Sequence, residues 1–214
     1  MKSYIQLKKT FREELPPEFK ADDVRYAEGL VEYFVEMYTE PDGVVFDPFA
    51  GLGTTLTTAE RMGRQAYGIE ISESKVRYIR GKLQHPERLI HGDARQLANF
   101  DFPLIDLAIT SPPFMSRGDP EDPLTDYSTK GKGYRAYLRD LRNVFGQLQN
   151  RIKPSGQLVI EVSNLKVEGE LTTLAWDLGS EISRVLRFEG EIIVCWDKYD
   201  YGYDHSYCLV YSIV

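Results

Sequence analysis

The sequence predicts an α/β protein with a mostly parallel sheet of about seven strands, helices on both faces and an antiparallel C-terminal hairpin. Two observations predict this fold class. From residue 44 onward, short apolar runs alternate with segments of helical periodicity, and the last two apolar runs have no helix between them. With 214 residues and 42% hydrophobic content, we expect one domain over residues 24–214, preceded by an irregular N-terminal arm over residues 1–23.

The elements follow from apolar spacing and from turn signals. Helices are expected over residues 24–38, 54–61, 72–82, 134–152 and 171–186. Strands are expected over residues 44–46, 66–71, 89–91, 104–109, 157–162, 191–196 and 207–213. Because open parallel sheets bind ligands beyond the carboxyl ends of their strands, the residues that follow each strand are the candidate site.

Composition narrows the class of protein. No stretch reaches the ~18 apolar residues of a membrane span, and no apolar segment follows the charged N-terminus as in a secretory signal. The two cysteines, Cys195 and Cys208, favour a reducing, cytoplasmic location, and with three histidines they suggest no metal site. The net charge of −7 has the wrong sign for coating nucleic acid, but residues 115–155 carry eight basic and five acidic side chains. A polyanion is therefore expected at that segment.

A glycine-rich loop follows the first predicted strand. It reads Asp47-Pro48-Phe49-Ala50-Gly51-Leu52-Gly53-Thr54-Thr55 and runs into a helix whose free N–H groups face the same space. The loop lacks the third glycine of a dinucleotide fold and the Gly-Lys-Ser/Thr ending of a phosphate-binding loop. Taken alone, such a loop also fits an ordinary glycine turn.

Acidic residues end the next two predicted strands. Glu70 lies 23 positions after Asp47, where these folds hold a ribose diol with a carboxylate. Asp93 follows the third strand and can accept a hydrogen bond from an adenine amino group. Each has an ordinary alternative, a solvated strand end for Glu70 and a cap of the next turn for Asp93.

The fourth predicted strand ends at Ser111-Pro112-Pro113-Phe114, the most specific signal in the chain. Neither proline can donate a hydrogen bond, so the local carbonyls are left as acceptors. Phe114 adds a flat apolar face. This combination predicts a slot for a planar group that carries an N–H, and a proline-rich strand exit packed in the core is the alternative.

Residues 47–55 resemble the S-adenosylmethionine-binding motif of the amino-methyltransferases that act on nucleic-acid bases, and residues 111–114 resemble their (D/N/S)-P-P-(Y/F) catalytic motif. The Ser form is typical of the cytosine-N4 enzymes. The resemblance implies a Rossmann-like methyltransferase fold, S-adenosyl-L-methionine as cofactor, and methyl transfer to an exocyclic amine, cytosine N4 before adenine N6. The implied catalytic residues are Ser111, Pro112, Pro113 and Phe114. The implied cofactor-binding residues are Asp47, Phe49, Ala50, Gly51, Gly53, Thr54, Thr55, Glu70, Ile71, Asp93 and Ala94.

Target contacts are expected after the catalytic motif. Many DNA-modifying members of the family carry a separate target-recognition domain, but only 19 residues separate Phe114 from the next predicted helix, so none is expected here. DNA is the family's usual target and is slightly favoured over structured RNA. The expected substrate-binding residues are Arg117, Lys130, Lys132, Arg135, Tyr201 and Tyr203. A plain surface loop and a solvated helix face are the alternatives for this segment.

Other function classes stay open at this point. One is an rRNA or tRNA base N-methyltransferase, and another is a methyltransferase for a small molecule or a protein, which has no general need of the slot formed by the two prolines and Phe114. A third is a non-enzymatic binding subunit of a larger complex, although such a subunit has no reason to keep both pockets. The acidic ends of the chain also offer a docking surface for a second copy, which makes a homodimer an expectation.

Overall fold

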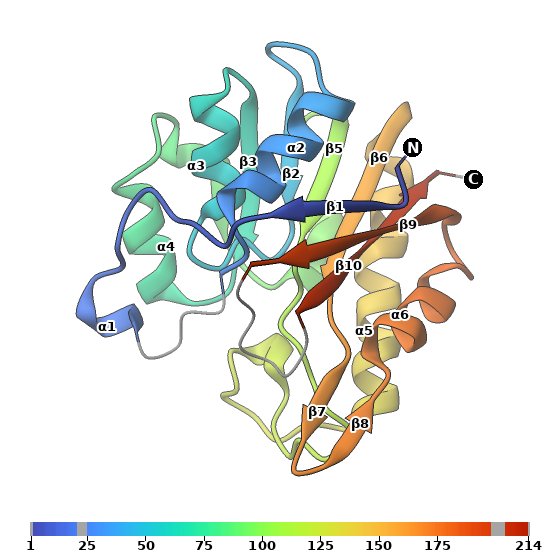
Figure 1. Ribbon diagram of the computed structural model, residues 1–214. Helices are drawn as coiled ribbons and strands as arrows, with labels where there is room; N and C mark the ends of the chain where they lie inside the picture. The colour runs from blue at the N-terminus through green and yellow to red at the C-terminus, as the bar shows by residue number, and fades with distance from the viewer. Residues whose placement is uncertain (1, 21–24, 198–203, 214) are drawn as a thin grey trace.

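The computed structural model describes residues 2–20, 25–197 and 204–213. Its centre is an eight-stranded sheet in the order β1-β9-β10-β6-β5-β2-β3-β4, and β7 and β8 form a separate two-stranded hairpin (Figure 1). The strands are β1 (Tyr4–Leu7), β2 (Val44–Asp47), β3 (Gln65–Glu70), β4 (Leu89–His91), β5 (Ile105–Thr110), β6 (Ile152–Val162), β7 (Leu165–Val167), β8 (Glu170–Thr172), β9 (Arg187–Trp196) and β10 (His205–Ser212).

The parallel strands bring their carboxyl ends to one edge of the sheet. β2 pairs with β3 and β5, β3 pairs with β4, and β5 pairs with β6, all in parallel. The chain passes outward from β2 through β3 to β4 and then returns to the opposite side of β2 as β5. The reversal of strand order between β2 and β5 is the position where open α/β sheets bind ligands.

Helices cover both faces of the sheet (Figure 1). Alternate strand residues feed two cores: Val45 and Leu107 pack with α2, α3 and α4, whereas Phe46 and Ala108 pack with α5 and α6. The α-helices are α1 (Pro17–Lys20), α2 (Glu28–Tyr38), α3 (Thr54–Arg61), α4 (Glu73–Arg80), α5 (Tyr134–Gln147) and α6 (Leu174–Ile182). The 3₁₀ turns are η1 (Pro86–Arg88), η2 (Ala94–Asn99), η3 (Pro123–Thr125) and η4 (Leu148–Asn150).

The predicted fold class is confirmed, but the N-terminal arm is not wholly irregular. β1 lies within it and pairs in parallel with the end of β9, which makes the sheet eight-stranded. Ile5, 8% exposed, joins the core on the α2 side. The pairing covers the edge that β9 would otherwise leave open, and four residues are too few for a sequence pattern to reveal.

Some helix and strand boundaries after residues 111–114 also differ from the predicted ones. The helix predicted to start at residue 171 begins at Leu174, because the preceding segment forms the hairpin β7–β8. The turn between β7 and β8 has Glu168 at φ 50° and Gly169 at φ 86°, the paired positive φ angles that tight hairpins favour. The helix predicted to reach residue 152 ends at Gln147, and β6 starts at Ile152.

Within residues 2–20, 25–197 and 204–213, no helix combines the length and the apolar content that crossing a membrane requires.

Candidate active site

The glycine loop between β2 and α3 depends on backbone angles that other residues rarely adopt. Gly51 has a φ of 56° and Gly53 a φ of 83°. A Cβ on Gly53 would lie 2.8 Å from Ile79 Cγ2, so this glycine also lets α4 pack closely against the loop. α3 begins at the next residue, Thr54, and its first N–H groups have no partner inside the helix. The sequence therefore forms a close-approach loop at the reversal point of the sheet.

Asp47 ends β2 as a buried carboxylate, 1% exposed. It accepts hydrogen bonds from Phe49 N at 2.9 Å and from Thr55 Oγ1 at 2.6 Å. The hydroxyl of Tyr26, just before α2, contacts Thr55 Oγ1. Burial raises the pKa of Asp47, and the hydrogen bonds to its carboxylate act in the opposite direction. Asp47 thus holds the two ends of the glycine loop in place.

Glu70 ends β3 and is 6% exposed. Its Oε2 accepts from Gly51 N at 2.7 Å, and its Oε1 accepts from Ser72 N at 2.8 Å. Burial raises the pKa of this carboxyl. Each carboxylate oxygen can accept more than one hydrogen bond, so Glu70 keeps acceptor capacity after fixing the loop. A fixed, partly satisfied carboxylate of this kind is able to receive two neighbouring hydroxyl groups.

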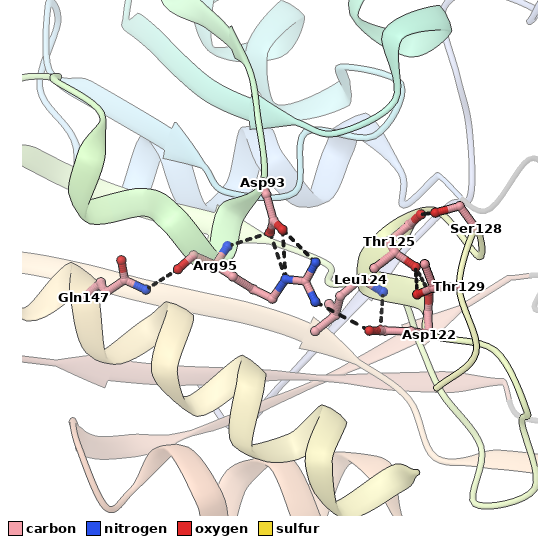
Figure 2. A network of polar contacts seen from close by, with 8 residues as sticks. All are labelled: Asp93, Arg95, Asp122, Leu124, Thr125, Ser128, Thr129 and Gln147. Carbon is pink, nitrogen blue, oxygen red and sulfur yellow. Dashed lines mark hydrogen bonds and ion pairs between the residues drawn. The ribbon is translucent and has the colours of Figure 1, made fainter. Parts of the chain in front are cut away.

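Asp93, after β4, is engaged by Arg95 (Figure 2). Its Oδ1 accepts from Arg95 N at 2.9 Å, and its Oδ2 lies 2.6 Å from Arg95 Nη2. Asp93 therefore caps η2, which confirms the alternative that the sequence left open. Arg95 Nη1 also lies 3.5 Å from Asp122 Oδ2, and the carbonyl of Arg95 accepts from Gln147 Nε2 at 3.1 Å. Contact between Asp93 and an adenine stays a prediction.

The other cofactor-side residues of the sequence analysis lie at the same edge of the sheet. Ala50 and Ala94 are buried, Thr54 opens α3, Phe49 packs against the α5 core, and the carbonyl of Ile71 lies 3.1 Å from His91 Nε2. Residues predicted from three separate strand ends are thus brought together by the parallel pairing of β2, β3 and β4.

The turn Ser111-Pro112-Pro113-Phe114, named the catalytic turn for its predicted role, follows β5 and is backed by a buried acid. Ser111 Oγ donates to Glu161 Oε2 at 2.8 Å. Glu161 lies on β6, is 4% exposed, and has its pKa raised by burial. Glu161 is not among the site residues predicted from the sequence. A single charged side chain inside the apolar run 158–162 was the available signal, because a buried charge in a strand needs a partner.

The carbonyls of the two prolines have different surroundings. Pro113 O accepts from the hydroxyl of Tyr137 on α5 at 2.9 Å. Pro112 O accepts no hydrogen bond from the described part of the chain. Phe114 is half-buried and packs against the core on the α5 side. The turn therefore offers one free carbonyl, one serine oxygen with acceptor capacity, and one aromatic ring.

A family model described as DNA methylase matches residues 13–81. The Type II methyltransferase M.BglII of Bacillus subtilis is 42% identical over 52 residues, which cover 24% of this chain and 14% of that protein. The Type II methyltransferase M.ScaI of Streptomyces caespitosus is 36% identical over 64 residues, covering 30% of this chain and 21% of that protein. The resemblance to DNA methylases is confirmed.

Solved structures agree on the fold. TrmN from Thermus thermophilus superposes with a TM-score of 0.61 at 16% identity, covering 92% of this chain and 52% of that one. A TehB-like methyltransferase from Corynebacterium glutamicum gives a TM-score of 0.56 at 13% identity, covering 92% and 93%. Identities this low show the Rossmann-like methyltransferase fold alone.

The sequence match to the DNA methylases covers one side of the candidate site. Residues 13–81 contain the glycine loop, Glu70 and Ile71, and the match ends before Asp93 and the catalytic turn. The curated relatives named above are matched over less than a quarter of their length. The serine, the prolines and the residues after them lie outside the family-model match.

The target-side residues predicted from the sequence fall into three groups. Arg117 is already engaged, since its Nη2 lies 3.1 Å from Asp177 Oδ2. The side chains of Lys130, Lys132 and Arg135 are exposed and form no hydrogen bond or ion pair with the described residues. Tyr201 and Tyr203 lie outside the described residues.

Segment 115–133, which joins the catalytic turn to α5, contains η3 and is attached to the cofactor side. The β-bridge between Glu121 and Lys130 closes the segment. Two ion pairs then reach the cofactor side: Asp126 Oδ1 lies 2.8 Å from Lys75 Nζ, and Asp122 contacts Arg95. The segment therefore contacts elements next to Glu70 and Asp93.

Proposed function

We propose that this chain is an S-adenosylmethionine-dependent methyltransferase that methylates the exocyclic amine of a nucleic-acid base, cytosine N4 in preference to adenine N6 and DNA slightly in preference to RNA. The observation that carries the proposal is the hydrogen bond from Ser111 to the buried Glu161 on a double-proline turn. That turn lies beside the glycine loop, at the reversal point of the sheet. A serine in this position is the form that the resemblance associates with cytosine N4.

The residues of the loop fit the cofactor. Positive φ angles at Gly51 and Gly53 keep side chains out of the space next to the backbone. Glu70 would hold the two ribose hydroxyls, because its carboxylate is fixed by two main-chain N–H groups and keeps acceptor capacity. Asp93 would receive the adenine amino group if Arg95 turns toward Asp122. When bound, the cofactor supplies a methyl group activated by a sulfonium.

The catalytic turn would prepare the amine for attack. The lone pair of an exocyclic amine is delocalised into the base, so the nitrogen is a poor nucleophile. Ser111 Oγ and Pro112 O would each accept one N–H bond, which favours a nitrogen whose lone pair points away from the ring plane, and Phe114 would stack on the base. Catalysis then comes mainly from positioning and from acceptors aimed at developing positive charge.

Glu161 would receive the proton that the amine loses. As the nitrogen gains a methyl group, one N–H hydrogen must leave. Ser111 donates to Glu161 Oε2, so a proton accepted at Ser111 Oγ can be exchanged for one delivered to Glu161. Burial raises the pKa of the Glu161 carboxyl, which increases its affinity for that proton.

Exposed cations beside the catalytic turn would bind the phosphates of the target. Lys130, Lys132, Arg135 and Arg139 are exposed and have no partner in the part of the chain that the structure describes. Other basic residues nearby are neutralised by carboxylates, for example Arg142 by Glu181 at 3.1 Å. The unpaired cations therefore give this one rim a positive field although the chain as a whole carries −7.

The test is an assay with purified protein, labelled S-adenosylmethionine and separate pools of DNA and total RNA that lack the modification. Products are digested to nucleosides and identified by mass. Label in N4-methyldeoxycytidine or N4-methylcytidine is the expected result and identifies the polymer. Label in N6-methyladenine nucleosides would correct the choice of base. Cofactor binding without label in either pool would overturn the nucleic-acid target and favour a small-molecule or protein substrate.

A further inference from the structure

Tyr137, on α5, touches the catalytic turn although it is no part of the motif. Its ring is 3% exposed, and its hydroxyl donates to Pro113 O at 2.9 Å. The two prolines have no N–H, so the turn cannot be attached to its neighbours through their main-chain donors. Two side-chain hydrogen bonds reach residues 111–114 from other described elements, one linking Ser111 to Glu161 and one linking Tyr137 to Pro113.

The hydroxyl of Tyr137 distinguishes the two proline carbonyls. With Pro113 O occupied, Pro112 O is the carbonyl of the pair that accepts nothing from the described residues. Since a carbonyl that is hydrogen-bonded to a buried donor keeps its direction, the orientation of the Pro113 peptide is fixed relative to α5. The neighbouring acceptor, Pro112 O, is thereby held at a fixed angle to Ser111.

The other end of the same segment is attached to the same corner of the fold. Arg117 Nη2 contacts Asp177 Oδ2, which also accepts from the hydroxyl of Tyr134 at 2.9 Å. The rings of Tyr134 and Tyr137 stack with centroids 6.1 Å apart. The residues between the two attachment points, 114–116, include the ring of Phe114.

We propose that Tyr137 is a positioning residue of the methyl transfer: its hydroxyl holds Pro113 O so that Pro112 O, Ser111 and Phe114 keep the geometry of the base slot. The inference rests on the proposed function for the nature of the reaction. It also gives Arg117 a structural part in place of the substrate contact that the sequence predicted.

The test replaces only the hydroxyl, with Tyr137→Phe, and compares it with Tyr211→Phe. Tyr211 is a matched control because it is also buried and its hydroxyl also donates to a main-chain carbonyl, Gly179 O of α6 at 3.2 Å, instead of to a carbonyl of the turn. We expect Tyr137→Phe to lower kcat about tenfold or more, the effect of a small misplacement at a reacting group. The Kd for the cofactor and the KM for the nucleic acid should stay within about twofold, and Tyr211→Phe should leave kcat unchanged.

A second readout keeps the inference testable apart from the reaction. Amide hydrogen exchange of residues 114–116 should become faster in Tyr137→Phe and stay unchanged in Tyr211→Phe. Equal kcat in wild type and Tyr137→Phe, or an equal loss in both variants, would overturn the positioning role. If the wild type methylates neither polymer, the proposed function fails, and the exchange measurement alone then decides whether Tyr137 fixes the turn.

Discussion

The two sides of the candidate site are built differently. On the cofactor side, residues 44–95, polar contacts join residues close in sequence: Asp47 binds Phe49 two residues away, and Glu70 binds Gly51 across 19 residues. On the target side, residues 111–181, Ser111 binds Glu161 across 50 residues and Arg117 binds Asp177 across 60. The carboxylates of the cofactor side thus bind main-chain groups close to them in sequence, whereas the contacts of the target side join distant elements.

This difference explains what a sequence comparison can find. A short segment that forms its own contacts keeps a recognisable residue pattern, and the DNA methylase match covers residues 13–81. The target side is formed by single residues of β6, α5 and α6. None of these residues lies in a local sequence motif that would identify it as part of a site. This difference predicts that cofactor binding and base methylation can be separated by mutation, since the polar contacts between the two sides described above are few: segment 115–133 touches Lys75 and Arg95, and Gln147 donates to the carbonyl of Arg95.

The largest expected effect is that of Ser111→Ala. This change removes the hydroxyl oxygen that would accept from the amine, and it also removes one of the two hydroxyls, those of Ser111 and Ser206, that hydrogen-bond to Glu161. We expect turnover to fall about 100-fold or more, the scale of losing one aligned hydrogen-bonding group in an active site. The Kd for S-adenosylmethionine, measured by calorimetry, should stay within about twofold because Ser111 has no bond to the glycine loop. An equal loss of turnover and cofactor affinity would mean that the two sides are one unit.

Glu70→Ala should act on cofactor affinity, in contrast to Ser111→Ala, which should act on turnover. Removing the carboxylate leaves the N–H groups of Gly51 and Ser72 without their partner and should weaken cofactor binding by about 1–3 kcal/mol. Glu60→Ala is the matched control, since Glu60 also accepts from two main-chain N–H groups, those of Gln84 and His85, away from the strand ends. Calorimetry should show weaker binding for the first variant and unchanged binding for the second. Similar affinities in both variants would exclude Glu70 as a ribose ligand.

The parts of the fold that the sequence predicts follow the same division between local contacts and contacts of distant elements. The run of strands and helices from 44 to 110 was predicted to within one or two residues, because apolar spacing and the turns around Gly43 and Ser72 are local signals. β1 and the hairpin β7–β8 were missed. β1 is held by its pairing with a strand about 190 residues later, and that partner is invisible in a four-residue pattern.

The site was predicted in the same uneven way. Asp47, Glu70 and Ser111 were found from their positions after apolar strands. Glu161 and Tyr137 were not, because one looks like an interruption of a strand and the other like an ordinary core position of an amphipathic helix. A sequence shows which residue follows a strand, but the contacts between elements decide which residue of another element meets it.

Glu161→Gln tests whether the buried, ionised carboxylate of Glu161 lowers the stability of the folded chain. Burial raises the pKa of Glu161 above its ordinary value of 4.5, so the folded chain binds this proton more tightly than the unfolded chain. The stability that this carboxyl contributes is complete below that ordinary value and is lost as the pH rises through the folded pKa. The free energy of unfolding of Glu161→Gln, taken as the difference from wild type, should therefore rise by about 1 kcal/mol from acidic to alkaline pH. The reason is that the amide can replace one hydrogen bond without carrying a charge.

The measurement is urea unfolding of both proteins at pH 4.5, 6.5 and 8.5, values spaced about two units apart to bracket the titration. Asp47 and Glu70 titrate in both proteins, so their contribution cancels in the difference. A difference that does not change with pH would show that Glu161 is as well solvated in the folded chain as in the unfolded one. Methylation activity of the variant should fall at every pH, in contrast to its stability.

The smallest expected effect concerns the joint between the two sides, the pair formed by Arg95 and Asp122 (Figure 2). The side chains are 31% and 17% exposed and lie 3.5 Å apart, so the pair should contribute less than about 1 kcal/mol. Asp122→Asn removes the charge but keeps an oxygen that can accept from Leu124 N, the bond that caps η3. Asp122→Ala removes both and should cost about 1 kcal/mol more.

Urea unfolding in low salt and in about 1 M salt separates the two contributions, because salt screens the ion pair and leaves the cap unchanged. We expect the loss in Asp122→Asn to disappear at high salt, whereas the additional loss in Asp122→Ala persists. If Asp122→Asn is as unstable as Asp122→Ala at low salt, the charge rather than the cap holds segment 115–133 against the cofactor side. The two sides would then be joined by electrostatics, and salt would weaken cofactor binding and base methylation together.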